Sequence, residues 1–406
     1  MAKLAVCGGK KVVNKVLGKA WPECGQPEVE AVSDVARSGI WWRGGHSDKR
    51  PSRVFEFENA WAKYHDAKHC VAVTNGTQAI ECALKAAGIQ QGDEVLVPAL
   101  TFVASATAIA LVNAVPVFVD VDPKTFNIDP EAMEAAVTRK TRGAVVVHNG
   151  GYPCDMDRVM KVAKRRKLMI IEDCAHAHAS QWKGKGVGAI GHLGTFSFQM
   201  GKTLTCGEGG AVVTDDDELA ELAFSYHHIG RMKDRPFYEF HRLASNLRMT
   251  EWQGAILLAQ LKRLTKQTAI RERNTKFLAK GMTKIDGVDA IARDRRVTRW
   301  GFYYWNFLYD QKKFDGIHRD LFIKAMNAEG VPVGVGAHGR PIYDNPVFEN
   351  MKLKKPHCPV AEHLHKNVAL SIGHRSFLGP ISDMKLILKA MQKVRENTDE
   401  LRKLAK

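Results

Sequence analysis

Two residues in the middle of the chain have the surroundings that carbonyl chemistry requires, and Lys202 is the first of them. It follows a strand-like run and precedes a glycine-rich turn in the stretch TFSFQMGKTLTCGEGG. A lysine held among apolar and small residues loses its proton more easily, and Schiff-base formation with an aldehyde requires that neutral amine. A lone lysine in a loop is usually solvated, so this interpretation depends on the residues around Lys202.

Asp173 is the second of these residues, and it ends the apolar run LMIIED. Ligands of open α/β sheets bind at the carboxyl ends of the strands, and a buried carboxylate there needs a cation or hydrogen-bond donors. Beside a pyridine nitrogen, Asp173 would keep that nitrogen protonated and let the ring accept an electron pair. A helix N-cap after the strand is the alternative for Asp173 considered alone.

The turn Thr74-Asn75-Gly76-Thr77 joins a predicted strand to the start of a predicted helix. Free backbone N–H groups and the positive end of the helix dipole favour phosphate binding at such a turn. Gly76 allows close approach, Thr77 adds a hydroxyl, and Ser197 is placed to add a further phosphate ligand. A purely structural turn is the alternative, because an Asn-Gly pair that caps a helix is common.

The tract 173–178, DCAHAH, also permits a metal site, because His176 and His178 would share one face if the strand continued through them. No second group of ligands is evident in the sequence. A bound aromatic cofactor would use the same residues as hydrogen-bond partners, so we favour the cofactor over the metal.

The composition is that of a globular enzyme. The 406 residues are 45% apolar and 26% charged, and no apolar run is long enough for a membrane span. The start MAKLAVCGGKK has too short an apolar stretch for a signal peptide. The eight cysteines form no CxxC pair. We therefore expect a cytoplasmic protein that neither enters a membrane nor depends on disulfides.

The net charge of +16 raises the question of nucleic-acid binding. The basic residues lie in many short groups, such as 164–167, 293–299 and 352–355, instead of one stripe interleaved with aromatic residues. This dispersal predicts a solvated basic surface that helps anionic substrates to arrive, and not a nucleic-acid binder.

The pattern of elements predicts an α/β fold, because short β-branched runs alternate with helical stretches. We predict strands at 70–74, 94–97, 115–120, 144–148, 168–172, 195–198 and 210–214. The intervening helices are predicted at 77–87, 103–112, 130–137 and 156–166. The last two strands lack a full helix between them, so part of the sheet would be antiparallel.

A long helix predicted at 250–273 would connect the sheet to a second region. We place a large domain with the N-terminal segment at 1–265 and a smaller C-terminal α+β domain at 266–406. The smaller domain holds the aromatic run GFYYWNFLY, a helix near Asp320 and a closing helix from about Ser382.

Five segments taken together resemble the DegT/StrS family. They are TNGTQAIECALKAAGIQQGDEVLVPALTF, VPVFVDVDPKTFNIDP, IEDCAHAHAS, FSFQMGKTLTCGEGGAVVT and SNLRMTEWQGAILLAQL, in this order. The resemblance extends from about Gly39 to the closing helix. It implies the fold type I architecture of aminotransferases that depend on pyridoxal 5'-phosphate (PLP), with a mostly parallel seven-stranded sheet.

The resemblance also implies roles for individual residues. Lys202 would form the Schiff base with PLP, and Asp173 would pair with the pyridinium nitrogen. Phe102 would stack on the cofactor ring, the alternative being an ordinary core phenylalanine. The phosphate would be bound by Gly76, Thr77 and Ser197. Asn246 would reach the phosphate from a neighbouring subunit, so the resemblance implies a homodimer with shared sites. His176 stands where many members have a glutamine facing the phenolic oxygen of the cofactor.

The reaction that the resemblance implies is transfer of an amino group from L-glutamate or L-glutamine to a keto sugar or a cyclitol ketone. Dehydratases of the family carry histidine at the Schiff-base position, so Lys202 favours an aminotransferase. The opening LAVCGGKKV and the pair Trp41-Trp42 resemble members that act on cyclitols or free sugars. A nucleotide-sugar aminotransferase and a non-catalytic PLP-binding regulator remain as alternatives. Candidate substrate contacts without assigned roles are Arg43, Arg231, His338 and Tyr343.

Overall fold

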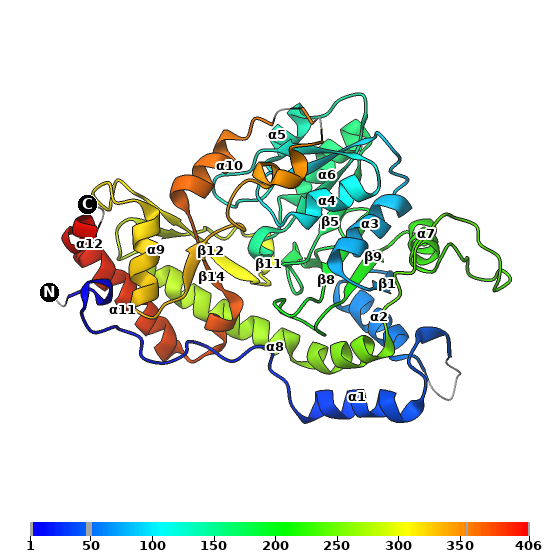
Figure 1. Ribbon diagram of the computed structural model, residues 1–406, viewed down its shortest axis with the longest axis horizontal. Coiled ribbons are helices and arrows are strands. Elements are labelled where there is room, and N and C mark those ends of the chain that lie inside the picture. Colours follow the sequence, from blue (N-terminus) through cyan, green and yellow to red (C-terminus); the bar gives the residue numbers. More distant parts are fainter. Residues whose placement is uncertain (1–2, 46–50, 352, 355, 405–406) are drawn as a thin grey trace.

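The centre of the computed structural model is a seven-stranded sheet with the strand order β1-β9-β8-β5-β4-β2-β3 (Figure 1). The structure describes residues 3–45, 51–351, 353–354 and 356–404. The strands are β1 (His69–Val73), β2 (Glu94–Pro98), β3 (Val115–Val119), β4 (Thr141–Val147), β5 (Met169–Asp173), β8 (Leu193–Ser197) and β9 (Gly210–Thr214). All seven predicted strands are thus present, with ends shifted by a few residues.

Five neighbouring strands, from β8 to β3, run parallel, while β9 is antiparallel to both β8 and β1. This confirms the predicted α/β fold with a mostly parallel sheet. The sequences of these strands are continuous apolar runs, because helices cover both faces of a parallel sheet and bury the side chains on each face. Their carboxyl ends, except that of β9, meet at one edge, which is where polar side chains gather.

Helices α3 (Gly76–Ala86), α4 (Ala104–Leu111), α5 (Pro130–Ala135) and α6 (Met156–Arg166) occupy the four positions predicted for them. Helices that had not been predicted include α1 (Gln26–Ser38), α2 (Arg53–Tyr64), α7 (Asp217–His227) and the short α10 (Pro359–His363). Helix α2 buries Phe57 and Trp61 against Phe196 and Phe198 of the sheet region. It thereby builds a second core cluster beside the main one.

The C-terminal part is an antiparallel sheet of four strands covered by helices. The strands are β10 (Val288–Ala290), β12 (Tyr304–Tyr309), β14 (Ala369–Gly373) and β13 (Val333–Val335). Its longer helices are α9 (Arg319–Ala328), α11 (Ile381–Glu396) and α12 (Thr398–Leu404). The predicted additional C-terminal α+β region is therefore present. None of the helices in the described part of the chain has both the length and the apolar character needed to cross a bilayer.

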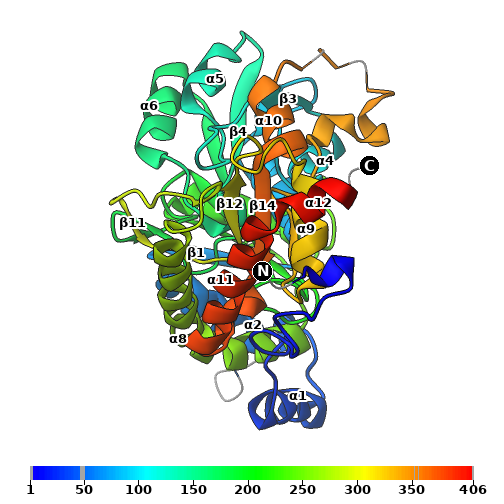
Figure 2. The ribbon, with the colours of Figure 1, turned by 90° about the vertical axis from the view of Figure 1, so that its left-hand side faces the viewer.

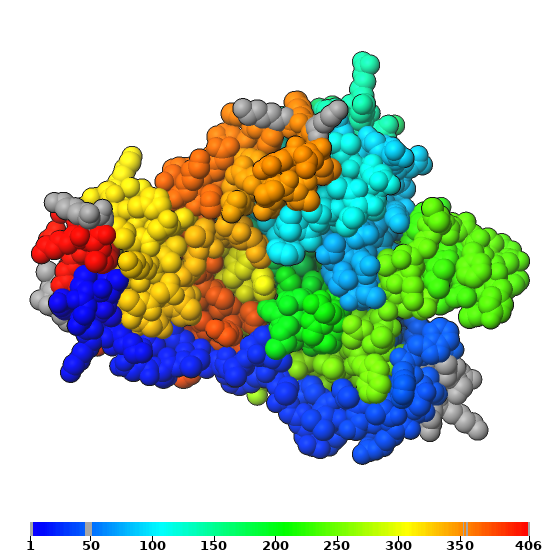
Figure 3. Space-filling view, in the orientation of Figure 1, coloured from blue at the N-terminus to red at the C-terminus, as the bar shows by residue number. Residues whose placement is uncertain are grey.

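Helix α8 (Glu251–Met282) connects the two sheets and is longer than predicted, with 32 residues (Figure 1). The predicted boundary after residue 265 falls inside this helix. The N-terminal residues lie against the C-terminal part, as Figures 2 and 3 show. The Leu4 N–H donates to Glu400 Oε2 at 2.8 Å, and the Gly18 N–H donates to Asp383 Oδ2 at 3.1 Å. The division into domains at 1–265 and 266–406 stays a prediction.

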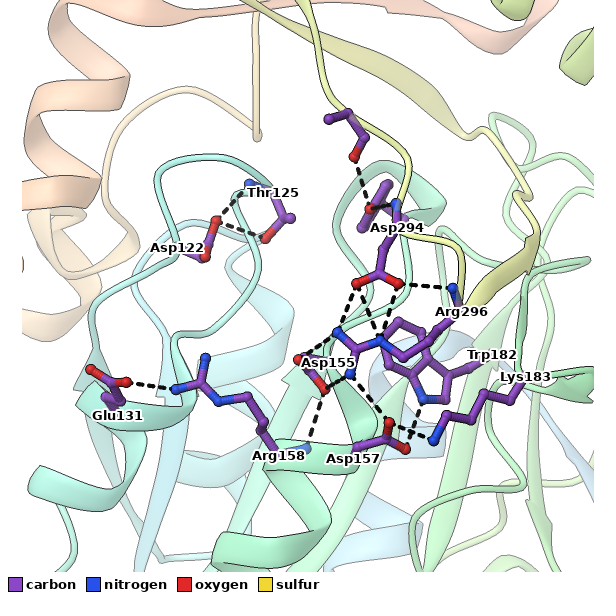
Figure 4. A network of polar contacts seen from close by, with 12 residues as sticks. Asp122, Thr125, Glu131, Asp155, Asp157, Arg158, Trp182, Lys183, Asp294 and Arg296 are labelled. Carbon is purple, nitrogen blue, oxygen red and sulfur yellow. Dashed lines mark hydrogen bonds and ion pairs between the residues drawn. The ribbon is translucent and has the colours of Figure 1, made fainter.

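A polar network links the start of α6 to the turn that precedes β11 (Val297–Arg299), as Figure 4 shows. Arg296 donates to Asp155 Oδ2 at 2.9 Å, to Asp294 Oδ2 at 2.7 Å and to Asp157 Oδ2 at 3.2 Å. Asp155 also accepts from the Arg158 N–H at 3.2 Å and so caps α6. One guanidinium thus joins segments that are distant in sequence.

Candidate active site

The cavity at the carboxyl ends of the strands has a volume of about 810 Å³. It brings together seven of the eight predicted site residues, Gly76, Thr77, Phe102, Asp173, His176, Ser197 and Lys202. They converge because β1, β2, β5 and β8 point the same way, and each of these residues ends one of these strands, lies in the loop that follows it or begins the next helix.

Lys202 is buried at the wall of this cavity, with 8% of its surface exposed. Burial lowers its pKa from 10.5 to about 8, and the nearby carboxylate of Asp173 opposes this shift. Its Nζ atom lies 4.2 Å from the centre of the Tyr303 ring. With a pKa of about 8, roughly a tenth of the Lys202 side chains carry the neutral amine at pH 7, against fewer than about one in a thousand at the ordinary pKa, and attack on a carbonyl requires this neutral form.

Asp173 lies at the end of β5 and is 5% exposed. The Ser105 hydroxyl donates to Oδ2 at 2.8 Å, and the Ala175 N–H donates to Oδ1 at 3.1 Å. These two donors fix the plane of the carboxylate, and the cavity is open beside it. The helix-cap alternative for Asp173 is wrong, because the chain continues from β5 through turns to residue 181 without a helix. One carboxylate oxygen takes the N–H of the local turn, and the group still lines the cavity.

The predicted phosphate-binding turn lies at the start of α3. The Asn75 side chain caps the helix by accepting from the Gln78 N–H at 2.9 Å. A Cβ atom on Gly76 would lie 2.5 Å from the Cβ atom of Ser197, so only glycine fits against β8 at this point. The first turn of α3 therefore presents free N–H groups to the cavity beside two hydroxyls, those of Thr77 and Ser197.

Phe102 is 53% exposed and lines the cavity, so the alternative of a core phenylalanine is wrong. A flat apolar surface left open in a polar cavity suits stacking on an aromatic ligand. Its ring centre lies 5.7 Å from that of His338, a residue of the C-terminal part.

His176 is buried at the cavity and stacks on Tyr303, with ring centres 4.7 Å apart and an angle of 14° between the planes. Its Nε2 atom lies 2.9 Å from Nε2 of His338. Burial, followed by the positive charge of Lys202, lowers the pKa of His176 well below its ordinary value. Within the described residues its Nδ1 atom has no hydrogen-bond partner, which leaves one ring nitrogen for a ligand.

His178 does not share a face with His176, because β5 ends at Asp173 and the chain then turns. The Nδ1 atom of His178 accepts from the Leu204 N–H at 3.0 Å, and Nε2 donates to the Ser197 carbonyl at 2.8 Å. Both ring nitrogens are thus engaged by the loop that carries Lys202. The imidazole holds this loop, and the predicted metal-binding face is wrong in its geometry.

A different group, His148, Glu172 and Cys174, brings potential metal ligands within 4.8 Å of one another. Glu172 already accepts from His148 and from the N–H groups of Gly188, Ile190 and Gly191. Burial alone would raise the pKa of Glu172, but the His148 contact and these N–H groups lower it. The hydrogen-bonding capacity of Glu172 is therefore filled by protein groups, and the carboxylate has a structural role. It connects the segment 188–191 to the sheet.

The eighth predicted residue, Asn246, lies outside this cavity and is exposed, with its backbone bridged to that of His228. Of the candidate substrate contacts, only His338 lines the cavity. Arg43 binds Glu58 through two hydrogen bonds of 2.7 and 2.9 Å, Arg231 donates to the Phe237 carbonyl at 2.6 Å, and the Tyr343 hydroxyl donates to Glu362 at 3.0 Å.

Sequence reasoning missed Ser105 and Tyr303, which both line the cavity. Ser105 lies three residues after Phe102 at the start of α4, so its position next to the ligand-binding edge was a usable signal. Tyr303 belongs to the aromatic run GFYYWNFLY, and nothing in that run distinguishes the cavity-facing ring from the core-facing ones.

A seven-stranded, mostly parallel sheet with a buried lysine, a strand-end carboxylate and an anion cradle at one edge defines a PLP-dependent aminotransferase. The donor set fits that cofactor, because the glycine cradle accommodates a phosphate and Phe102 offers a free stacking surface. The sequence model of the DegT/DnrJ/EryC1/StrS aminotransferase family matches residues 22–382. The chain belongs to this family.

The chain is similar over most of its length to curated relatives and to solved structures of the same family. It is 35% identical to the L-glutamine:scyllo-inosose aminotransferase of Streptomyces griseus in an alignment of 424 residues. This alignment covers 98% of this chain and 99% of the relative. It is 42% identical to the 3-amino-5-hydroxybenzoate synthase of Amycolatopsis mediterranei in an alignment of 287 residues. This alignment covers 70% of this chain and 72% of the relative. The crystal structure of a 3-amino-5-hydroxybenzoic acid synthase superposes with a TM-score of 0.84 at 34% identity and covers 95% of this chain and 99% of that one.

Proposed function

We propose that this aminotransferase moves the amino group of L-glutamine to the ketone of a cyclitol of the inosose type, with Lys202 as the Schiff-base residue. The observation that carries the proposal is the buried amine of Lys202, whose pKa of about 8 and position between Asp173 and the α3 cradle suit Schiff-base chemistry. The names of relatives that match nearly the whole chain support this donor and acceptor. L-Glutamate and a keto sugar remain the broader alternatives.

Each residue of the cavity has a proposed task. Asp173 would hold the ring nitrogen of PLP, the first turn of α3 with Thr77 and Ser197 would hold its phosphate, and Phe102 would cover one ring face. His176 lines the same cavity, has an unpartnered Nδ1 atom and would contact the phenolic oxygen. The chemistry that PLP supplies when bound is storage of the electron pair released from the substrate.

Lys202 performs the proton transfer in this scheme. Its neutral amine would accept the proton from Cα of the amino donor and deliver it to C4′ of the cofactor, the carbon on the other side of the amino nitrogen. The same amine runs these steps in reverse when the ketone enters, so the acceptor leaves as an amine. Burial of Nζ beside the Tyr303 ring keeps bulk water away from it and preserves the neutral form that both directions need.

The test is a pair of half-reactions followed by visible absorbance. L-Glutamine should convert the cofactor of the purified protein to its amine form, and scyllo-inosose or 2-deoxy-scyllo-inosose should restore it. Lys202→Ala should lose both changes together with the visible band of the bound cofactor. A yellow, active Lys202→Ala protein would overturn the assignment of Lys202.

The acceptor screen also separates the alternatives. Restoration only by a nucleotide-linked keto sugar would favour a nucleotide-sugar aminotransferase. A visible band that no amino donor changes would favour the non-catalytic PLP-binding regulator. The complete set of buried lysine, carboxylate and cradle favours catalysis, because a binding protein has no chemical need for a neutral lysine beside a buried carboxylate.

We further propose a homodimer with shared sites. Asn246 is exposed and lies outside the cavity of its own chain, which suits a contact with the cofactor phosphate of a second copy. Aromatic residues in the segment 237–240 are also exposed, Phe237 by 53%, Tyr238 by 81% and Phe240 by 52%. An apolar surface of this kind suits burial between subunits.

A further inference from the structure

Residues 18–25 bring a tryptophan to the loop that carries Lys202. The indole Nε1 of Trp21 donates to the Met200 carbonyl at 3.1 Å. Its ring also packs edge-on against His374, with ring centres 4.6 Å apart and planes at 88°. Met200 and Gly201 directly precede Lys202, so the N-terminal segment is attached to the backbone that positions the reactive amine.

His374, which follows β14, binds the next carbonyl of the same loop. Its Nε2 atom lies 3.0 Å from the Gly201 carbonyl, and its Nδ1 atom lies 3.1 Å from Nη2 of Arg271. An arginine can only donate, so Nδ1 accepts, and the ring hydrogen must sit on Nε2 and point at Gly201. Burial and the neighbouring charge of Arg271 lower the pKa of His374 well below its ordinary value, which keeps this neutral tautomer.

Arg271 is fully buried in α8 and lies over the Trp21 ring, with its guanidinium carbon 5.5 Å from the ring centre. Burial lowers its pKa to about 9, opposed by the charge of Glu23. Among the described residues, its Nε and Nη1 atoms have no hydrogen-bond partner. A buried cation with incomplete hydrogen bonding is costly, so its presence calls for a purpose beyond packing.

We infer that Trp21, His374 and Arg271 are positioning residues that hold the Lys202 loop in place, Trp21 and His374 directly and Arg271 by fixing the tautomer of His374. They bind the two carbonyls before Lys202, while His178 binds Leu204 after it and Ser197 before it. The N-terminal segment and the C-terminal part therefore both contribute to a site whose other residues lie on the large sheet. This inference rests on the proposed role of Lys202 as the reacting amine.

The physical consequence concerns the environment of Nζ. Desolvation is the larger of the two effects on the pKa of Lys202, and it depends on how closely the loop presses the amine against Tyr303. Releasing the Met200 or Gly201 carbonyl lets the loop move and water reach Nζ. The pKa of Lys202 should then rise from about 8 toward its ordinary value.

The decisive variant is Trp21→Phe, which keeps an aromatic ring at this position and removes the indole N–H together with part of the ring. Trp182→Phe is the matched control, because its Nε1 also donates one hydrogen bond, to Asp157 at 3.2 Å, and it is buried away from the Lys202 loop. The full-length chain is stripped of cofactor, its lysines are methylated with ¹³C-formaldehyde, and Lys202 is titrated by NMR. Lys202→Arg identifies the signal.

We expect Trp21→Phe to raise the pKa of Lys202 by at least half a unit, which leaves about threefold less neutral amine at pH 7.5. Trp182→Phe should leave the pKa unchanged. His374→Phe should raise it as Trp21→Phe does, and His374→Gln, which keeps an N–H donor within reach of Gly201, should restore it. The pH midpoint of the visible band in the cofactor-loaded protein should follow the same order.

An unchanged pKa of Lys202 in Trp21→Phe and His374→Phe would overturn the inference, even if both variants melt at a lower temperature. If Trp21→Phe does not fold, the comparison of His374→Phe with His374→Gln decides the question. The titration needs no cofactor and no substrate. Failure of the proposed function would show instead as a Lys202→Ala protein that keeps its response to L-glutamine, so the two failures are distinguishable.

Discussion

Two opposing influences on one amine set the chemistry at the scale of single residues. Burial lowers the pKa of Lys202 and the charge of Asp173 raises it, with a result of about 8. Without the Asp173 carboxylate, the Lys202 amine would be neutral over a wider range of pH. The site would then lack the anion that is proposed to hold the ring nitrogen of the cofactor. Without the burial the amine would be a solvated ammonium ion. The site therefore needs both influences.

Asp173→Asn should separate these two effects. The amide keeps the shape of the side chain but removes its charge. We expect kcat to fall about a hundredfold or more, which is the usual effect of removing a group that stabilises the charge formed in the transition state. The pKa of Lys202 should fall below about 8, because Asp173 raises it. Steady-state kinetics and NMR titration measure the two. Ser105→Ala is the control, since it removes one hydrogen bond of 2.8 Å and leaves the charge. An unchanged kcat in Asp173→Asn would contradict the assignment.

The rate at which the stripped protein recaptures PLP should depend on pH through Lys202. The pKa of about 8 means that the neutral amine is scarce at pH 6 and dominant at pH 9. The capture rate should therefore rise about tenfold per pH unit below 8 and level off above it. Stopped-flow absorbance from pH 6 to 10 measures this profile. A rate that keeps rising to pH 10 would show that the amine is solvated.

The sequence sufficed to identify the residues whose role follows from their own element. Asp173, Gly76 and Ser197 each stand at the end of a readable strand or the start of a readable helix. His338 was predicted as a substrate contact, and the structure places it at the cavity. Tyr303 could not be identified, because it reaches the cavity from the C-terminal part and no local pattern records that packing. The contacts between Trp21 and the Lys202 loop were missed for the same reason.

At the scale of elements, the start of α3 is the tightest point of the site. Gly76→Ala would place a Cβ atom 2.5 Å from Ser197, so the strand or the helix must shift. We expect a loss of about 1–3 kcal/mol in unfolding free energy together with weaker cofactor binding. Chemical denaturation and cofactor titration measure these. The control is Gly334→Ala, where an added Cβ meets nothing within 4 Å. Equal effects in both variants would contradict this account.

The network around Arg296 should stabilise the junction of α6 with the turn before β11 (Figure 4). Its three carboxylate partners are partly exposed, so we expect Arg296→Met to cost about 1–2 kcal/mol of unfolding free energy. The loss should shrink at 1 M salt, where the ion pairs are screened. Urea denaturation at low and high salt checks this. A loss that does not depend on salt would point to packing against Trp182 instead.

Periodicity and turn residues predicted the large sheet well, because buried parallel strands leave continuous apolar runs such as VVV in β4. The small strands β6 (Gln181–Trp182) and β7 (Lys185–Gly186) have two residues each and no period to detect. Helix α2 was missed although Ser52 caps it and Phe57 and Trp61 have helical spacing. The sequence pattern of a capped amphipathic helix was present for α2. The small strands are recognisable only from their hydrogen-bonded pairing with neighbouring strands.

At the scale of the whole molecule, the proposed dimer allows a complementation experiment. Lys202→Ala removes the amine of a chain's own site, and Asn246→Asp should place a repelling charge beside the phosphate of its partner's site. Each variant alone should be nearly inactive. After mixing and exchange of subunits, mixed dimers should contain one intact site, so activity should return to about a quarter of the native value. No recovery, with dimers and subunit exchange confirmed by sedimentation and mass spectrometry, would contradict shared sites.

Helix α8 is about 48 Å long at 1.5 Å per residue, and both of its ends are buried. Leu257 and Leu264 pack in the core beside the large sheet, while Leu278 and Met282 pack in the core that includes the smaller one. Unfolding of either part of this helix would expose apolar side chains that one of the two cores buries, so loss of one core removes part of the support of the other. Calorimetry should therefore record one cooperative heat-absorption peak for both sheets.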